Sequence, residues 1–136
     1  MQISGPGISP GNVYEAIGGE ATFDQLVDGF YAQVPDDDIL GPMYPPEDMA
    51  GARRRLKLFL IQYWGGPNTY SAERGHPRLR MRHHPFRIDR AAAERWLTLM
   101  GNSFERIDDE TIPPAYRSMM WDHMERVAAM LVNTPD

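Results

Sequence analysis

The stretch YWGGPNTYSAERGHPRLRMRHHPF, residues 63–86, decides the fold. Its Gly65-Gly66-Pro67 run ends the helix that precedes it. The wider segment 67–88 contains three prolines and five arginines and has no long periodic run of apolar residues. Because proline lacks a backbone donor and clashes with the preceding turn, this segment cannot be one long helix. We predict an irregular loop that holds a short helix around 78–83.

Apolar residues on both sides of this loop recur at helical spacing. Phe23, Leu26 and Phe30, for example, lie on one stripe of a helix. The chain shows no convincing period-two strand pattern and no internal repeat, so the predicted fold class is all-α. The expected helices are a turn at about 12–17 closed by Gly18-Gly19, one at 21–34 stopped by Pro35, one at 48–64, one at 90–107 with Asp89 as N-cap, and one from Pro113-Pro114 to about 132.

Composition narrows the range of functions. A chain of 136 residues and 15.5 kDa fits one domain; we expect a flexible lead-in at 1–11 and a globular domain at 12–136. The absence of cysteine excludes disulfides, Cys-ligated metals and Cys nucleophiles. A net charge of −5 argues against a general nucleic-acid binder. No transmembrane segment or signal peptide is apparent, and we expect a cytoplasmic location.

Histidine supplies the candidate metal ligands. Three of the four histidines, His76, His83 and His84, cluster in the irregular segment, and their spacing does not match a zinc site. A single axial ligand to haem iron needs only one of them, beside a flat apolar pocket. His123, in the last helix, is expected to be structural or solvent-exposed.

Polar groups on the inward stripes have two interpretations. Tyr31 and Trp96 lie on apolar stripes, where they either belong to the core or direct their polar ends at a water, a carbonyl or a ligand. The arginines of residues 78–82 form a solvated basic face, a nucleic-acid patch or a partner for the carboxylates of an anionic cofactor. The acidic run at 36–38 is expected to be a solvated turn.

Over residues 13–134 the chain resembles the group II truncated haemoglobins, and it is most similar to the actinobacterial members. The motifs that carry the resemblance are Tyr14-x-x-Ile17-Gly18-Gly19, Phe30-Tyr31, Tyr44-Pro45, Phe59-Leu60-x-x-Tyr63-Trp64-Gly65-Gly66-Pro67, Gly75-His76-Pro77-Arg78-Leu79-Arg80-Met81-Arg82-His83-x-Pro85-Phe86, and Trp96.

The resemblance implies a truncated globin fold, in which two pairs of helices are sandwiched around haem b. It assigns His83, and not His84, as the axial ligand of the iron. The residues that it places on the distal, ligand-binding side are Tyr31, Tyr44, Trp96, Leu56 and Ala52. Those that it places in contact with haem are Phe59, Arg55, Tyr70, Met81, Arg82 and Phe86, with Arg55 and Tyr70 reaching the propionates.

The implied function is reversible binding of O2, and of CO and NO, at a five-coordinate iron. Up to three hydrogen-bond donors converge on the gas ligand, so slow O2 release is expected. The alternative is a redox enzyme, acting in NO dioxygenation or as a peroxidase, that depends on a separate reductase. Oxygen transport, catalysis and the choice between monomer and homo-oligomer all stay open at this stage.

Overall fold

The computed structural model describes residues 12–135, so the predicted lead-in at 1–11 lies outside the described residues. Helices are the only regular elements of the described chain. None of them is long and apolar enough to cross a membrane. They are α1 (Val13–Ala16), α2 (Glu20–Tyr31), α3 (Met49–Tyr63), α4 (Thr69–Arg74), α5 (Leu79–His83), α6 (Arg90–Glu105) and α7 (Pro114–Leu131), with short 3-10 helices at Val34–Asp36, Gly41–Met43 and Pro46–Asp48.

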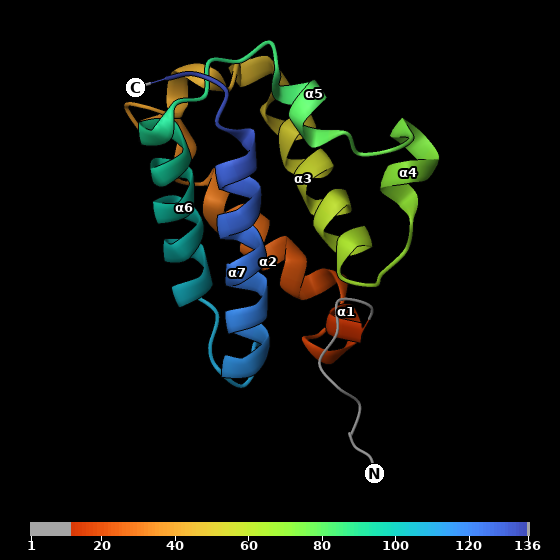
Figure 1. The fold of residues 1–136 in the computed structure, drawn as a ribbon. Helices are drawn as coiled ribbons and strands as arrows, with labels where there is room; N and C mark the ends of the chain where they lie inside the picture. Colours follow the sequence, from red (N-terminus) through yellow and green to blue (C-terminus); the bar gives the residue numbers. More distant parts are fainter. Residues whose placement is uncertain (1–11, 136) are drawn as a thin grey trace.

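The four long helices form two pairs. α2 packs against both α3 and α6, and α6 packs against α7. In Figure 1, α6 and α7 run side by side, while α3 and the short helix α5 lie on the other side of the molecule. Large side chains between the helices are fully buried and form the core: Phe23, Leu26, Phe30, Leu60, Trp64, Met100, Met120 and Met124. The pairing leaves α3 and α5 facing α7.

Several helix ends follow the sequence prediction. Gly18 and Gly19 have φ of 109° and 70°, a region that L side chains rarely adopt, and they end α1. The Asp89 side chain accepts the N–H of Ala92 at 2.9 Å and caps α6. These signals depend on neighbours in the sequence, which is why they could be read without the structure.

Two segments differ from the sequence prediction. α2 ends at Tyr31, and the chain then runs through a 3-10 helix at Val34–Asp36 before the turn. Residues Thr69–Arg74 form α4, inside the stretch predicted to be irregular apart from 78–83. A helix of six residues is too short to display a hydrophobic period, and α4 buries only Tyr70.

Candidate functional site

The site is built around His83, the last residue of α5. Its Nδ1 lies 2.8 Å from the carbonyl oxygen of Leu79, one turn earlier in the same helix. A ring nitrogen that donates to a carbonyl fixes the tautomer, so Nε2 is left as a lone-pair donor. His84 is exposed and has no such bond. Of the two neighbouring histidines, His83 is therefore the one prepared to ligate a metal.

The loop before His83 is held by Arg82. Its guanidinium donates to the carbonyl of Pro77 at 2.7 Å and to that of Arg74 at 2.7 Å, with a longer contact to His76. Residue Arg78, at the start of α5, has a left-handed backbone with φ of 44°. These bonds order a segment that has no long helix, and they fix the direction in which α5 starts.

Three polar aromatic side chains converge on the opposite side of the core. The rings of Tyr31 and Tyr44 meet edge to face, with centroids 5.6 Å apart. Tyr31 and Trp96 both pack on Phe30, with centroids 4.9 and 5.4 Å away. Trp96 also makes a side-chain hydrogen bond to Tyr44. The structure thus brings together residues from α2, from α6 and from the turn after Gly41–Met43.

Tyr44 shares hydrogen bonds with both other members of this trio. Burial, the nearby Tyr44 and a hydrogen bond to Tyr44 raise the pKa of Tyr31 far above its usual value. Burial also raises the pKa of Tyr44, whereas its bonds to Tyr31 and Trp96 lower it. The indole N–H of Trp96 can only donate, so Tyr44 is the acceptor of that bond. Tyr31 and Tyr44 share the other bond, for which each hydroxyl has one O–H to donate.

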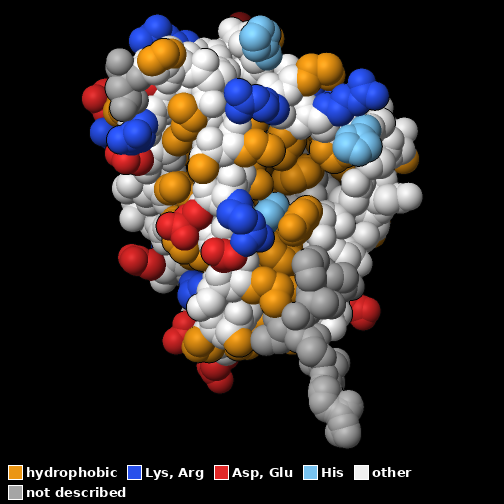
Figure 2. All heavy atoms as spheres, in the orientation of Figure 1, with side chains coloured by type: hydrophobic (Ala, Val, Ile, Leu, Met, Phe, Trp, Pro, Cys, Tyr) orange, Lys and Arg blue, Asp and Glu red, His pale blue; other side chains and the backbone are white. Residues whose placement is uncertain are grey.

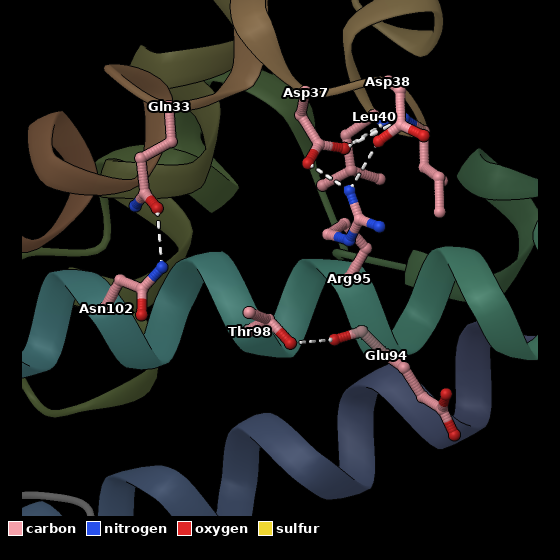
Figure 3. A network of polar contacts seen from close by, with 9 residues as sticks. Gln33, Asp37, Asp38, Leu40, Glu94, Arg95, Thr98 and Asn102 are labelled. Atoms are coloured by element: carbon pink, nitrogen blue, oxygen red, sulfur yellow. Dashed lines mark hydrogen bonds and ion pairs between the residues drawn. The ribbon is translucent and has the colours of Figure 1, made fainter.

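An ion pair fixes the turn that carries Tyr44. Arg95 Nη1 lies 2.6 Å from Asp37 Oδ1 and 2.7 Å from Asp38 Oδ1 (Figure 3). The other oxygen of Asp37 accepts the N–H groups of Leu40, at 2.7 Å, and of Ile39. Although burial acts to raise it, the pKa of Asp37 is lowered by these N–H groups and by Arg95. Asp37 is therefore an anchor between the turn and α6, not part of a solvated turn as the sequence predicted.

Apolar and aromatic side chains of α3 and α4 form a wall. The ring of Phe59 lies 5.7 Å from that of Tyr70 and 6.3 Å from that of Tyr63. Leu56 is partly buried against the core, and Ala52 is 9% exposed. Figure 2 shows hydrophobic side chains gathered on the face between α3 and α7. Large hydrophobic side chains remain partly exposed around this region, with Tyr63 at 38% and Phe86 at 46%.

The other residues that the resemblance placed at haem lie as follows. Arg55 is paired with Asp48 at 2.6 Å, and the guanidinium of Arg74 covers the face of buried Tyr70. The ring of Phe86 lies 6.4 Å from that of His83. Met81 is 58% exposed and lines a surface hollow with His84. The structure does not bring Met81 to the side of α5 that carries the His83 ring, because residues two apart on a helix face different ways.

His123 is buried, at 5% exposure, in contact with the aromatic wall. Its ring stacks on Tyr63 with centroids 3.8 Å apart and meets Trp64 edge-on. Its Nδ1 has no hydrogen-bond partner. Burial and the nearby Arg126 lower the pKa of His123 to about 4. Of the two expectations for this residue, the structural one holds: His123 is a neutral ring in the core.

Stability is expected to fall as the pH is lowered through the range set by His123. The unfolded chain takes up the proton near the ordinary pKa of 6.5, whereas the folded chain resists until about 4. Between these values the unfolded state binds more protons, so acid favours unfolding. From pH 7 to pH 5 this residue removes about 2 kcal/mol. Denaturant unfolding of the wild type and of His123→Phe at both pH values measures the difference; equal losses in the two proteins would contradict it.

Comparison with known proteins identifies the family. The model of the bacterial-like globins matches residues 12–133. The chain belongs to this family. It is 40% identical to the group 2 truncated hemoglobin YjbI of Bacillus subtilis over 120 residues, which cover 88% of this chain and 87% of that protein.

Solved structures of truncated globins confirm the fold. The thermostable hemoglobin of the actinobacterium Thermobifida fusca is 49% identical, with a TM-score of 0.81 over 90% of this chain and 98% of that one. The truncated oxygen-avid haemoglobin of Bacillus subtilis is 40% identical, with a TM-score of 0.78 over 88% and 98%. The predicted fold class and the resemblance to group II truncated haemoglobins are therefore confirmed.

Membership of a globin family implies a haem cofactor and the binding of diatomic gases such as O2. The residues of the site fit haem. The Nε2 atom of His83 is left for the iron, and the large side chains of Tyr63 and Phe86 remain partly exposed, as a porphyrin contact requires. No group of three or more His, Asp or Glu side chains among residues 12–135 is arranged to hold a metal ion by itself. A single imidazole with a porphyrin is consistent with this arrangement.

Proposed function

We propose that this globin holds haem b through Nε2 of His83 and binds O2 reversibly beneath Tyr31, Tyr44 and Trp96. The observation that carries the proposal is the bond from His83 Nδ1 to the Leu79 carbonyl, because it leaves one ring nitrogen free in a defined direction. The lack of cysteine favours haem b over a haem joined by thioether bonds. It also agrees with a reducing cytoplasm, which is where we place the protein.

When bound, haem would supply an iron atom able to take up O2, CO or NO. The role of His83 is to hold that iron. Its hydrogen bond to Leu79 makes the ring a better donor and prevents rotation about the side chain. Phe59 and Phe86 supply apolar contact to the porphyrin, and Leu56 and Ala52 border the space for the gas ligand.

The propionates need polar partners at the edge of the pocket. The guanidinium groups of Arg55 and Arg82 are engaged, with Asp48 and with backbone carbonyls respectively. Contact with a propionate requires Arg55 or Arg82 to exchange such a bond for a new one. Among residues 12–135 the Tyr70 hydroxyl has no competing hydrogen bond to another side chain, so we propose that it makes the first contact.

Tyr44 is the proposed principal donor to the gas ligand. The indole N–H of Trp96 can only donate to its oxygen, and we propose that Tyr31 donates to it as well, so that the two bonds orient the O–H of Tyr44. A donor that is already oriented loses little entropy on meeting the ligand, and it acts mainly by slowing escape. We therefore propose slow O2 release, which suits retention of oxygen better than rapid delivery. The relative from Bacillus subtilis is described as oxygen-avid, which supports this proposal.

The absorption spectrum of the purified protein tests the proposal. The expected result is a Soret band in the ferric state that shifts on reduction and shifts again with CO and with O2. Release of O2 from the reduced protein is then followed by stopped-flow mixing with excess CO. Absence of a Soret band after haem is added would refute haem binding, and fast O2 release would refute the role of the distal donors.

A further inference from the structure

Positive charge is concentrated around α5. Residues 74–87 contain five arginines and no carboxylate, although the chain as a whole has a net charge of −5. Arginine and histidine side chains gather over α5 in Figure 2. The arginines are Arg74, Arg78, Arg80, Arg82 and Arg87.

Only Arg74 of these five arginines acts on nearby carboxylates of residues 12–135, since it helps to lower the pKa of Asp48 and of Glu73. None of the five arginines forms an ion pair with a carboxylate among residues 12–135, and the side chains of Arg78 and Arg87 have no partner there. Arg80 donates to the carbonyl of Met130, and Arg82 donates to the carbonyls of its own loop. Basic side chains elsewhere do pair with carboxylates: Arg53, Arg54, Arg55, Lys57, Arg95, Arg117 and Arg126. The positive electrostatic potential around α5 therefore extends into the solvent.

Two shallow, open hollows lie within the basic region, and the one at Met81 is mainly apolar. One surface hollow of about 430 Å³ is lined by Arg80, Met81, His84 and Pro85. A second of about 310 Å³ shares His84 and Pro85 and extends to Phe86 and Arg87. We call the two together the α5 groove. Met81 is 58% exposed at its centre. Exposed methionine and aromatic side chains with arginine at the edge are typical of protein interfaces.

We propose that the α5 groove docks an acidic electron-carrier protein, whose carboxylates meet the arginines around an apolar side chain that contacts Met81. The proposal rests on the proposed function, because it supplies electrons to haem held by His83. His84, in the groove, is the residue next to His83, so a docked partner lies within a short path of the iron. Interfaces of redox partners are small, commonly below about 1,200 Å² in total.

The step is a single electron transfer. One electron leaves the reduced flavin or iron–sulfur centre of the carrier, which is oxidised, and ferric iron becomes ferrous. No covalent bond forms or breaks. Charge complementarity acts mainly on the rate of encounter, so salt weakens the complex. A polyanion such as nucleic acid would pair with the arginines but offers no apolar side chain to contact Met81 and Pro85 in the hollow.

Backbone NMR provides the test. The probe is an acidic flavodoxin with oxidised FMN, added to the ¹⁵N-labelled holoprotein in its diamagnetic ferrous CO form. We expect amide shifts confined to residues 78–87 and to Asn133 and Thr134, which also line the second hollow. We also expect a Kd that rises with salt. Arg87→Glu should raise the Kd about tenfold. Arg106→Glu, the same change at an exposed arginine at the other end of α6, should change it less than about twofold.

Each other outcome overturns the docking proposal. Shifts scattered over the surface, or equal effects of Arg87→Glu and Arg106→Glu, would show that the attraction is not specific to the groove. Shifts of residues 78–87 with vesicles of anionic lipid, and none with flavodoxin, would assign the surface to a membrane instead. The CO spectrum recorded before titration separates the two hypotheses: its absence refutes haem binding, whereas a normal spectrum without groove shifts refutes docking alone.

Discussion

Replacing Tyr44 by phenylalanine is expected to raise the O2 dissociation rate constant about 10- to 100-fold. The indole N–H of Trp96 donates to Tyr44, and the proposed function makes Tyr31 its second donor, which leaves the O–H of Tyr44 for the ligand. A hydrogen bond to a partly charged ligand in a buried site contributes about 1.5–3 kcal/mol. Each 1.4 kcal/mol corresponds to tenfold in the equilibrium, and loss of a donor acts mainly on escape.

The three donors are expected to differ in how much each slows O2 dissociation. Tyr31→Phe and Trp96→Phe each remove one bond to Tyr44 and leave its O–H in place, so each should raise the rate less than Tyr44→Phe does. Tyr116→Phe removes a hydroxyl from a partly buried tyrosine outside the trio and serves as the control. Stopped-flow displacement of O2 by CO measures all four. A Tyr44→Phe rate equal to that of Tyr116→Phe would contradict the assigned donor.

The second large effect is expected at the crossing of α2 and α6. A Cβ added to Gly29 would lie 3.1 Å from the Cβ of Ser103 and 3.5 Å from its Cα, and would collide with its hydroxyl. That hydroxyl donates to the carbonyl of Leu26 at 2.5 Å and is buried. Gly29→Ala should therefore destabilise the protein by about 2–3 kcal/mol, through overpacking and a broken buried hydrogen bond.

A double variant checks the cause. In a Ser103→Gly background the space beside residue 29 is open, so Gly29→Ala should be neutral or stabilising by up to about 1 kcal/mol, the helix preference for alanine. Gly101→Ala in α6, where a Cβ meets Trp121 at an ordinary 3.4 Å, should cost little. Denaturant unfolding gives each free energy. A loss on Gly29→Ala that persists after Ser103→Gly would disprove the steric explanation.

The long helices were predictable because their signals are local. Apolar period, the Asp89 cap and the paired prolines before α7 all act within a few residues. The position of Tyr44 was not predictable from such signals, since it lies outside any long helix. The turn before it is held by Arg95, 58 residues away from Asp37 in the sequence. Only the family resemblance pointed to Tyr44.

Local sequence signals also could not distinguish His83 from His84 as the metal ligand. Adjacent histidines are equivalent by composition, and spacing alone excluded a zinc site without selecting either residue. The bond from His83 Nδ1 to Leu79 distinguishes them, and it depends on α5 being helical over five residues. For His123, sequence left two environments open, because the stacking of its ring on Tyr63 joins α7 to α3. A bond within α5 decides the first case, and packing between distant helices decides the second.

The absorption spectra of His83→Ala and His84→Ala test directly whether His83 holds the iron. His83→Ala and His84→Ala are purified, supplied with haem, reduced and exposed to CO. If His83 holds the iron, His83→Ala lacks the wild-type Soret band and its CO shift, added imidazole restores both in part, and His84→Ala matches the wild type. A normal CO spectrum in His83→Ala, or its loss in His84→Ala, would contradict the site described above.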